Sequence, residues 1–134
     1  MTYCQLQKNW DVKMVEAAGL TKISQANDLS PKPKNYCHPC VGGDLVRAAG
    51  FFGLPGVTHY CVEVAWKELV QVDKQFGCYL SDVIVENIHP DFEKSVLDTT
   101  YKEAGTVKEK DISVWNEWRE KEFDDFYNRA LSVL

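Results

Sequence analysis

Cysteine and histidine side chains are the clearest candidates for chemistry in this chain. Cys37 and Cys40 stand in a Cys-His-Pro-Cys turn, and His59 and Cys61 form a second pair further along. A Cys-x-x-Cys turn brings two thiolates to one ion, and a pair from a distant element completes the tetrahedral set that zinc prefers. If a metal is bound, the pattern predicts Cys37, Cys40, His59 and Cys61 as its ligands and zinc as the cofactor. The alternatives are redox chemistry at the first pair and inert thiols that pack as small apolar residues.

The first cysteine pair also permits thiol chemistry. Cys37-His38-Pro39-Cys40 resembles, over these four residues, the Cys-x-Pro-Cys active-site turn of thioredoxin-like oxidoreductases, in which a helix lowers a thiol pKa. That resemblance implies a buried strand before the turn and a later cis-proline. The residues before this turn read SPKPKNY, and no proline follows Pro90. We therefore expect local thiol chemistry without the thioredoxin fold.

Aromatic residues near the C-terminus indicate a second kind of site. Apolar positions from Ile112 to Leu134 follow helical spacing around an arc of about 220°, wider than the roughly 100° stripe that a surface helix buries. Either this helix is central to the domain, or its edge with Trp115 and Trp118 faces a protein partner. Arg119 interrupts the arc, which predicts a carboxylate opposite it on another element or another chain. Positions on the helical wheel favour Trp115 for the core and Trp118 for the partner.

Elements that would position these residues are mostly helical by their apolar spacing. The expected helices cover approximately residues 5–20, 44–52, 63–77, 90–105 and 111–134. Pro90 suits a first helical position, and Asp111 is expected to cap the last helix. The fold class expected is therefore mainly α: one compact domain over residues 1–134, with five to six helices.

Two regions depart from the helical pattern. Residues 21–42 contain three of the five prolines together with Asn, Asp and Ser, and this composition predicts a long loop. A loop of that length in a small domain is usually functional. Residues 57–64 and 80–86 have β-branched side chains as well as apolar residues at helical spacing, so the sequence leaves open whether they form helix or a small strand pair.

Charge restricts the classes of partner. The chain has a net charge of −5: residues 1–80 hold eight Lys and Arg against seven acids, and residues 81–134 hold seven against 13. An acidic half repels the nucleic-acid backbone, so we expect no nucleic-acid binding and a protein partner that is basic. No apolar run approaches the roughly 20 residues that span a bilayer, which predicts no membrane span. A homo-oligomer is left open.

Cysteine usage indicates the compartment. Five cysteines are an odd number in a chain long enough to have its own core, which is typical of a reducing, intracellular and cytoplasmic setting. The leading hypothesis is a non-enzymatic protein-binding or assembly component that acts through its C-terminal aromatic helix and the 21–42 loop. The alternative is a metal- or thiol-dependent enzyme centred on Cys37 and Cys40.

Overall fold

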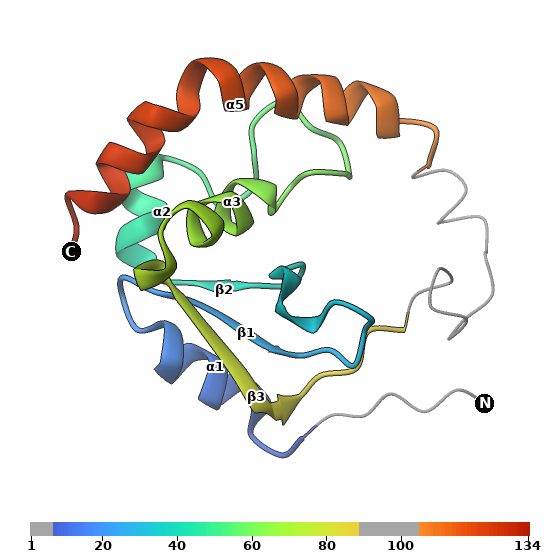
Figure 1. Cartoon of the computed structure of the whole chain (residues 1–134), viewed down its shortest axis with the longest axis vertical. Helices are drawn as coiled ribbons and strands as arrows, with labels where there is room; N and C mark the ends of the chain where they lie inside the picture. The colour runs from blue at the N-terminus through green and yellow to red at the C-terminus, as the bar shows by residue number, and fades with distance from the viewer. Residues whose placement is uncertain (1–6, 89–104) are drawn as a thin grey trace.

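A three-stranded sheet lies between helices in the computed structural model, which describes residues 7–88 and 105–134 (Figure 1). Strand β1 (Ile23–Asn27) is central, with β2 (Cys40–Val41) antiparallel on one side and β3 (Gly77–Ile84) parallel on the other. The register of β1 on β3 shifts between Ala26 and Asn27, so the two strands separate slightly at their carboxyl ends. The sheet is therefore mixed and small.

The expected mainly α fold of five to six helices is wrong, because the described residues form a mixed α/β fold. They contain four α-helices and two short 3-10 helices, of which α1 ends at Gly19 in the positive-φ conformation that suits glycine. The helix expected over 90–105 falls almost entirely outside the described residues. None of the helices described is long and apolar enough to cross a membrane. The helices are α1 (Trp10–Ala18), α2 (Gly43–Ala49), α3 (Val64–Val72) and α5 (Lys108–Leu131), with η1 (Pro33–Asn35) and η2 (Lys74–Phe76).

The segment 21–42 is not a continuous loop, since it contains β1, η1 and β2. Its central strand was missed because it buries polar side chains, which give no apolar alternation. Ser24 donates through Oγ to the carbonyl of Met14 at 2.7 Å, and Gln25 accepts from the backbone N of His38 at 3.1 Å. These bonds satisfy the two side chains inside the fold.

The alternative of a strand pair between 57–64 and 80–86 is not what the structure shows. Strand β3 covers most of 80–86, but its partner is β1, and 57–64 is a series of turns before α3. Asp111 explains those turns: its buried carboxylate accepts backbone N–H groups from Thr58, His59 and Tyr60 at 2.7–2.9 Å. Since α5 begins at Lys108, Asp111 lies inside the helix and anchors this loop instead of capping the helix.

Two apolar clusters hold the helices against the two faces of the sheet. Met14, Ala26 and Val83 join α1 to one face of the sheet. The larger cluster lies on the other face, where the buried Trp66 of α3 packs among aromatic rings of the loop after α2 and of α5. Helix α5 arches over this layer, and its Tyr127 hydroxyl donates to Asp73 at 2.8 Å (Figure 1). The sheet and its flanking loops are thus held between two separate cores.

Candidate functional site

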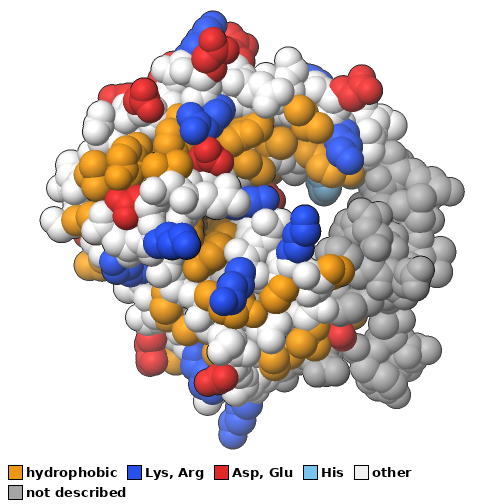
Figure 2. Space-filling view, viewed as in Figure 1, with side chains coloured by type: hydrophobic (Ala, Val, Ile, Leu, Met, Phe, Trp, Pro, Cys, Tyr) orange, Lys and Arg blue, Asp and Glu red, His pale blue; other side chains and the backbone are white. Residues whose placement is uncertain are grey.

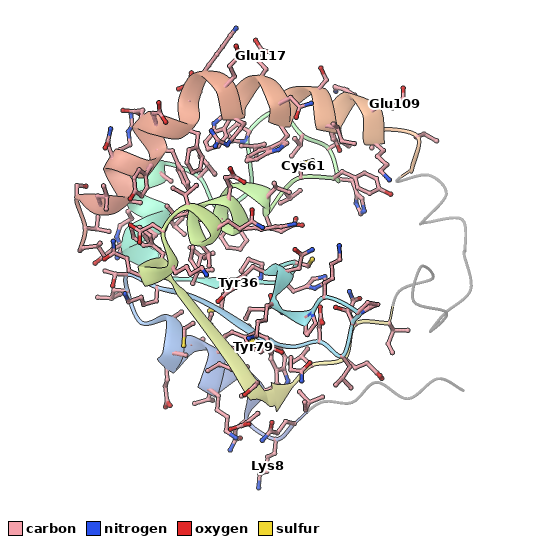
Figure 3. All side chains as sticks on the ribbon, in the orientation of Figure 1. Lys8, Tyr36, Cys61, Tyr79, Glu109 and Glu117 are labelled. Carbon is pink, nitrogen blue, oxygen red and sulfur yellow. The ribbon has the colours of Figure 1, made fainter. Side chains whose placement is uncertain are left out.

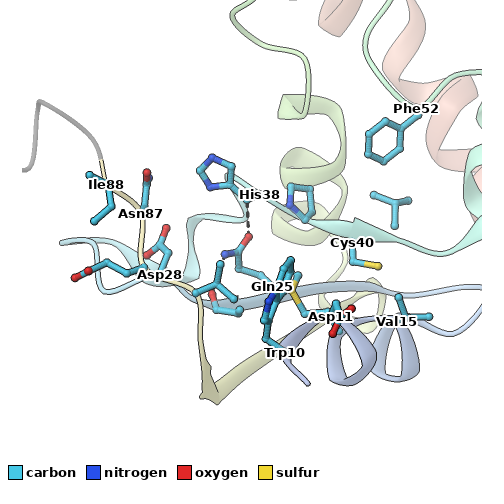
Figure 4. A pocket seen from close by; sticks show the side chains of 16 residues that line it. Trp10, Asp11, Val15, Gln25, Asp28, His38, Cys40, Phe52, Asn87 and Ile88 are labelled. Carbon is cyan, nitrogen blue, oxygen red and sulfur yellow. Dashed lines mark hydrogen bonds between the residues drawn. The ribbon is translucent and has the colours of Figure 1, made fainter. Parts of the chain in front are cut away.

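The main cavity of the described residues lies beside α1 at the β2 side of the sheet, with a volume of about 800 Å³ (Figure 4). Its walls come from the start of α1, from β1, from the turn into β2 and from the chain that follows β3. Phe52 approaches from the loop after α2. The lining residues are Trp10, Asp11, Met14, Val15, Gln25, Ala26, Asp28, His38, Pro39, Cys40, Val41, Phe52, Val85, Glu86, Asn87 and Ile88.

Local backbone chemistry opens the pocket. β2 pairs with β1 only at Cys40 and Val41, and the preceding Pro39 has no N–H to extend the ladder. His38 donates its N–H to the Gln25 side chain instead, so the chain leaves the sheet at this point. Gln25 Nε2 donates in turn to the carbonyl of Ala26 at 2.8 Å. The turn that contains His38 and Pro39 is therefore not paired with the backbone of β1, and the cavity lies beside this turn.

At the opposite wall of the pocket, backbone pairing between the β1 and β3 segments continues past the end of β3. Val85 donates its N–H to the carbonyl of Asn27 at 3.0 Å, and Asn87 donates to the carbonyl of Asp28 at 2.8 Å. This pairing brings residues 85–88 to the pocket. In Figure 4, Asp28, Asn87 and Ile88 lie together at one end of the pocket, away from Phe52.

Asp28 is the distinctive polar residue of this pocket. It is 3% exposed, and its carboxylate accepts one hydrogen bond within the described residues, from the backbone N of Ser30 to Oδ1 at 3.0 Å. A carboxylate can accept about four hydrogen bonds, and burying one with few donors is costly. The structure thus leaves acceptor capacity on Asp28 for a donor that enters the pocket.

Charge in the lining has one sign. Asp11, Asp28 and Glu86 are acidic, and no Lys or Arg is among the lining residues that the structure describes. The remaining wall is largely apolar and includes the rings of Trp10 and Phe52. Such a surface suits a ligand with an apolar body and a positively charged hydrogen-bond donor.

The predicted metal ligands do not converge. Among residues 7–88 and 105–134 there is no group of three or more His, Cys, Asp or Glu side chains that could hold a metal ion. Cys40 packs with the α1 cluster, whereas Cys37 feels the charges of Glu63 and Lys67 near α3. His59 is exposed, and Cys61 lies in the turns before α3. The prediction of a zinc site therefore awaits a metal measurement.

The surroundings of the Cys37 and Cys61 thiols differ from those of a reactive cysteine. Burial raises the pKa of Cys37, and the nearby Glu63 raises it further, although Lys67 and an Asn35 hydrogen bond oppose this. Burial also raises the pKa of Cys61, with Glu63 and Asp111 acting in the same direction. Activated thiols need a lowered pKa, so neither environment favours a thiolate.

The three residues predicted to bind a partner all have contacts within the chain. Trp115 and Trp118 are half-buried and stack with centroids 5.6 Å apart, and Trp118 also meets the Phe126 ring at 5.3 Å. Arg119 pairs with Glu68 of α3 at 2.8 Å and lies over the Phe123 ring. The predicted carboxylate opposite Arg119 is thus on another element of the same chain.

Sequence reasoning did not identify Asp28 or the aromatic walls of the pocket. Asp28 follows β1, inside the segment 21–42 that the sequence predicts as loop, and Trp10 lies in the helix predicted over 5–20. Their proximity depends on the packing of α1 against the sheet, which local spacing does not encode. The sequence did indicate that the unusually long segment 21–42 is functional, and this segment supplies Gln25, Asp28 and Cys40 to the pocket.

Comparison of the chain with protein-family models, with curated proteins and with solved structures gave no match. The function of the pocket is therefore inferred from its shape, burial and charge. Its size falls within the range of about 300–1,000 Å³ that is usual for ligand sites.

Proposed function

We propose that this protein is a non-enzymatic binding component that captures a basic segment of a protein partner in the pocket lined by Asp28. In this interpretation an Arg or Lys side chain enters the pocket, its aliphatic stem packs on the apolar wall, and its charged head reaches Asp28. Arg and Lys combine these two properties in one side chain. The cavity of about 800 Å³ is large enough for neighbouring residues of the partner as well.

The observation that supports this proposal most directly is the buried, under-bonded carboxylate of Asp28. A guanidinium or ammonium group would supply the missing donors in a charge-assisted hydrogen bond, which is stronger than a neutral one. Asp11 adds negative potential at the same site, and the described residues of the lining include no Lys or Arg that would compete. A negatively charged or purely apolar segment would leave Asp28 without a donor.

A peptide series tests the proposal. Acetylated, amidated pentapeptides that differ only in a central Arg, Lys, Met or Glu would be titrated into the full chain by calorimetry. We expect saturable one-to-one binding for the Arg and Lys peptides and at least tenfold weaker binding for the Met and Glu peptides. Asp28→Asn should abolish this discrimination, and Asp124→Asn, which changes an exposed carboxylate of α5, should preserve it. Equal affinity for all four peptides would exclude Asp28 as the recognition group.

A further inference from the structure

A second cavity has the opposite charge and lies between η1, α3 and the start of β3. It has a volume of about 370 Å³ and is lined by three lysines, Lys34, Lys67 and Lys74, with no acidic residue among the described residues of its lining. None of these lysines has an ion pair within the described residues. In Figure 2, several Lys and Arg side chains gather near the middle of the face shown. The site therefore concentrates unpaired positive charge from three separate elements.

Tyr36 places a hydrogen-bond donor in the same cavity. The residue is 7% exposed, and its hydroxyl lines the cavity without a hydrogen bond to any described residue. Buried tyrosine hydroxyls usually have a partner, so this one indicates a missing acceptor. Burial raises the pKa of Tyr36, and Cys78 and Tyr79 raise it further, so the hydroxyl keeps its proton as a donor.

Backbone geometry maintains this position of Tyr36. Its φ of 52° lies in the left-handed region that residues other than glycine rarely occupy. A Cβ on Gly77 would lie 2.8 Å from the Tyr36 hydroxyl and 2.6 Å from Val70 Cγ1, so the absence of a side chain at 77 makes room for the hydroxyl. Strained conformations of this kind are concentrated at functional sites.

Tyr79 completes the cavity and its aromatic wall. Lys34 Nζ lies 5.4 Å from the centroid of the Tyr79 ring, within the range of a cation–π contact. Figure 3 labels both tyrosines below α3, with Tyr36 nearer to that helix and Tyr79 nearer to β3. Burial raises the pKa of Tyr79, as does the charge of Asp28, so this hydroxyl also remains protonated. The cavity thus offers ammonium groups, phenolic donors and an aromatic surface.

We infer that this cavity binds the phosphate group of a small organic phosphate. A phosphate monoester has close to two negative charges and three strong acceptor oxygens, which match three ammonium groups and the Tyr36 hydroxyl. The volume left beyond the phosphate accommodates a compact organic group against Tyr79. Because the three lysines line one small cavity, the site fits a single phosphate better than a polymeric backbone.

Binding of two probes tests the inference in the full chain. Phenyl phosphate and inorganic phosphate would be titrated by calorimetry at 0.15 M salt, with phenol as the uncharged control. We expect saturable one-to-one binding of both phosphates, tighter for phenyl phosphate, and none of phenol. Failure of both phosphates to bind would overturn the inference, and so would binding of phenol with the affinity of phenyl phosphate.

Matched variants separate this site from general charge attraction. Lys67→Gln and Tyr36→Phe should each weaken phosphate binding about tenfold, and Lys110→Gln, on exposed α5, should leave it within about twofold. Tyr36→Phe removes a hydroxyl that has no protein partner, so its melting temperature should stay near that of the parent. Equal losses in Lys67→Gln and Lys110→Gln would show nonspecific attraction and refute the site. Asp28→Asn should retain phosphate binding, which keeps this test independent of the proposed peptide pocket.

Discussion

Replacing Asp28 by Asn should have opposite effects on stability and on binding. The substitution keeps the size of the side chain and its acceptor for the Ser30 N–H, which is 3.0 Å away. It removes the negative charge of a residue that is 3% exposed and whose carboxylate accepts no second hydrogen bond in the described part of the chain. Burying a polar group without a partner costs about 1–3 kcal/mol in proteins. The free protein should therefore gain stability.

The magnitude follows from how much of that cost the variant relieves. The new amide faces the same pocket and brings a donor of its own, so we expect a gain of about 1 kcal/mol, near the lower limit of that range. For a chain of this length, this corresponds to a rise in melting temperature of about 3–6 °C. Binding of the Arg pentapeptide should weaken by roughly 2–5 kcal/mol, which is about 30-fold or more in Kd.

Thermal unfolding and calorimetric titration of the same samples measure both effects. Asp124→Asn is the matched control, because it makes the same chemical change on an exposed face of α5 and should alter neither quantity. If Asp28→Asn lowers the melting temperature, the carboxylate is a structural group, and the reasoning is refuted. Unchanged affinity for the Arg peptide would equally refute it.

Three further predictions concern the aromatic helix, the anchored loop and the cysteines. In urea unfolding, Trp118→Ala should lower the free energy of unfolding by about 3 kcal/mol and Trp115→Ala by about half of that. The reason is that Trp118 has more ring partners than Trp115 among the described residues. The reverse order would contradict this packing. Burial alone would raise the pKa of Asp111, but three backbone N–H donors lower it below the usual value. The contribution of Asp111 to stability is therefore complete above about pH 4 and is lost as the pH falls through the lowered pKa. In a plot of melting temperature against pH, Asp111→Asn should flatten the decline at acidic pH. An unchanged decline would exclude this role. If zinc binds as the sequence predicts, elemental analysis should find about one equivalent, and Cys40→Ser should lower both the metal content and the melting temperature; metal-free, equally stable protein would end that hypothesis.

The helices were the predictable part of the fold because their signals are local. α1, α3 and α5 each have apolar residues at helical spacing, and Gly19 ends α1 where the pattern stops. Helix boundaries were less accurate, since the expected cap Asp111 lies within α5 and binds a distant loop. Side chains with long-range partners are thus easily mistaken for local signals.

The sheet was unpredictable for a physical reason. β1 buries Ser24 and Gln25, and the bonds that satisfy them come from α1 and from the turn before β2. Polar residues in such a strand look like loop until their partners are known. Because both cavities border the segment that contains β1 and η1, the error about this segment also hid the candidate sites.

Net charge proved a weak guide to the charge of a site. The overall value of −5 predicts a basic partner, yet the described residues line one cavity with three acids and another with three lysines. Each cavity collects its charges from several elements, so the charge of a sequence half does not predict them. The absence of nucleic-acid binding stays a prediction, and binding a polymer would require basic residues along an extended surface. Three lysines around about 370 Å³ instead select one phosphate at a time.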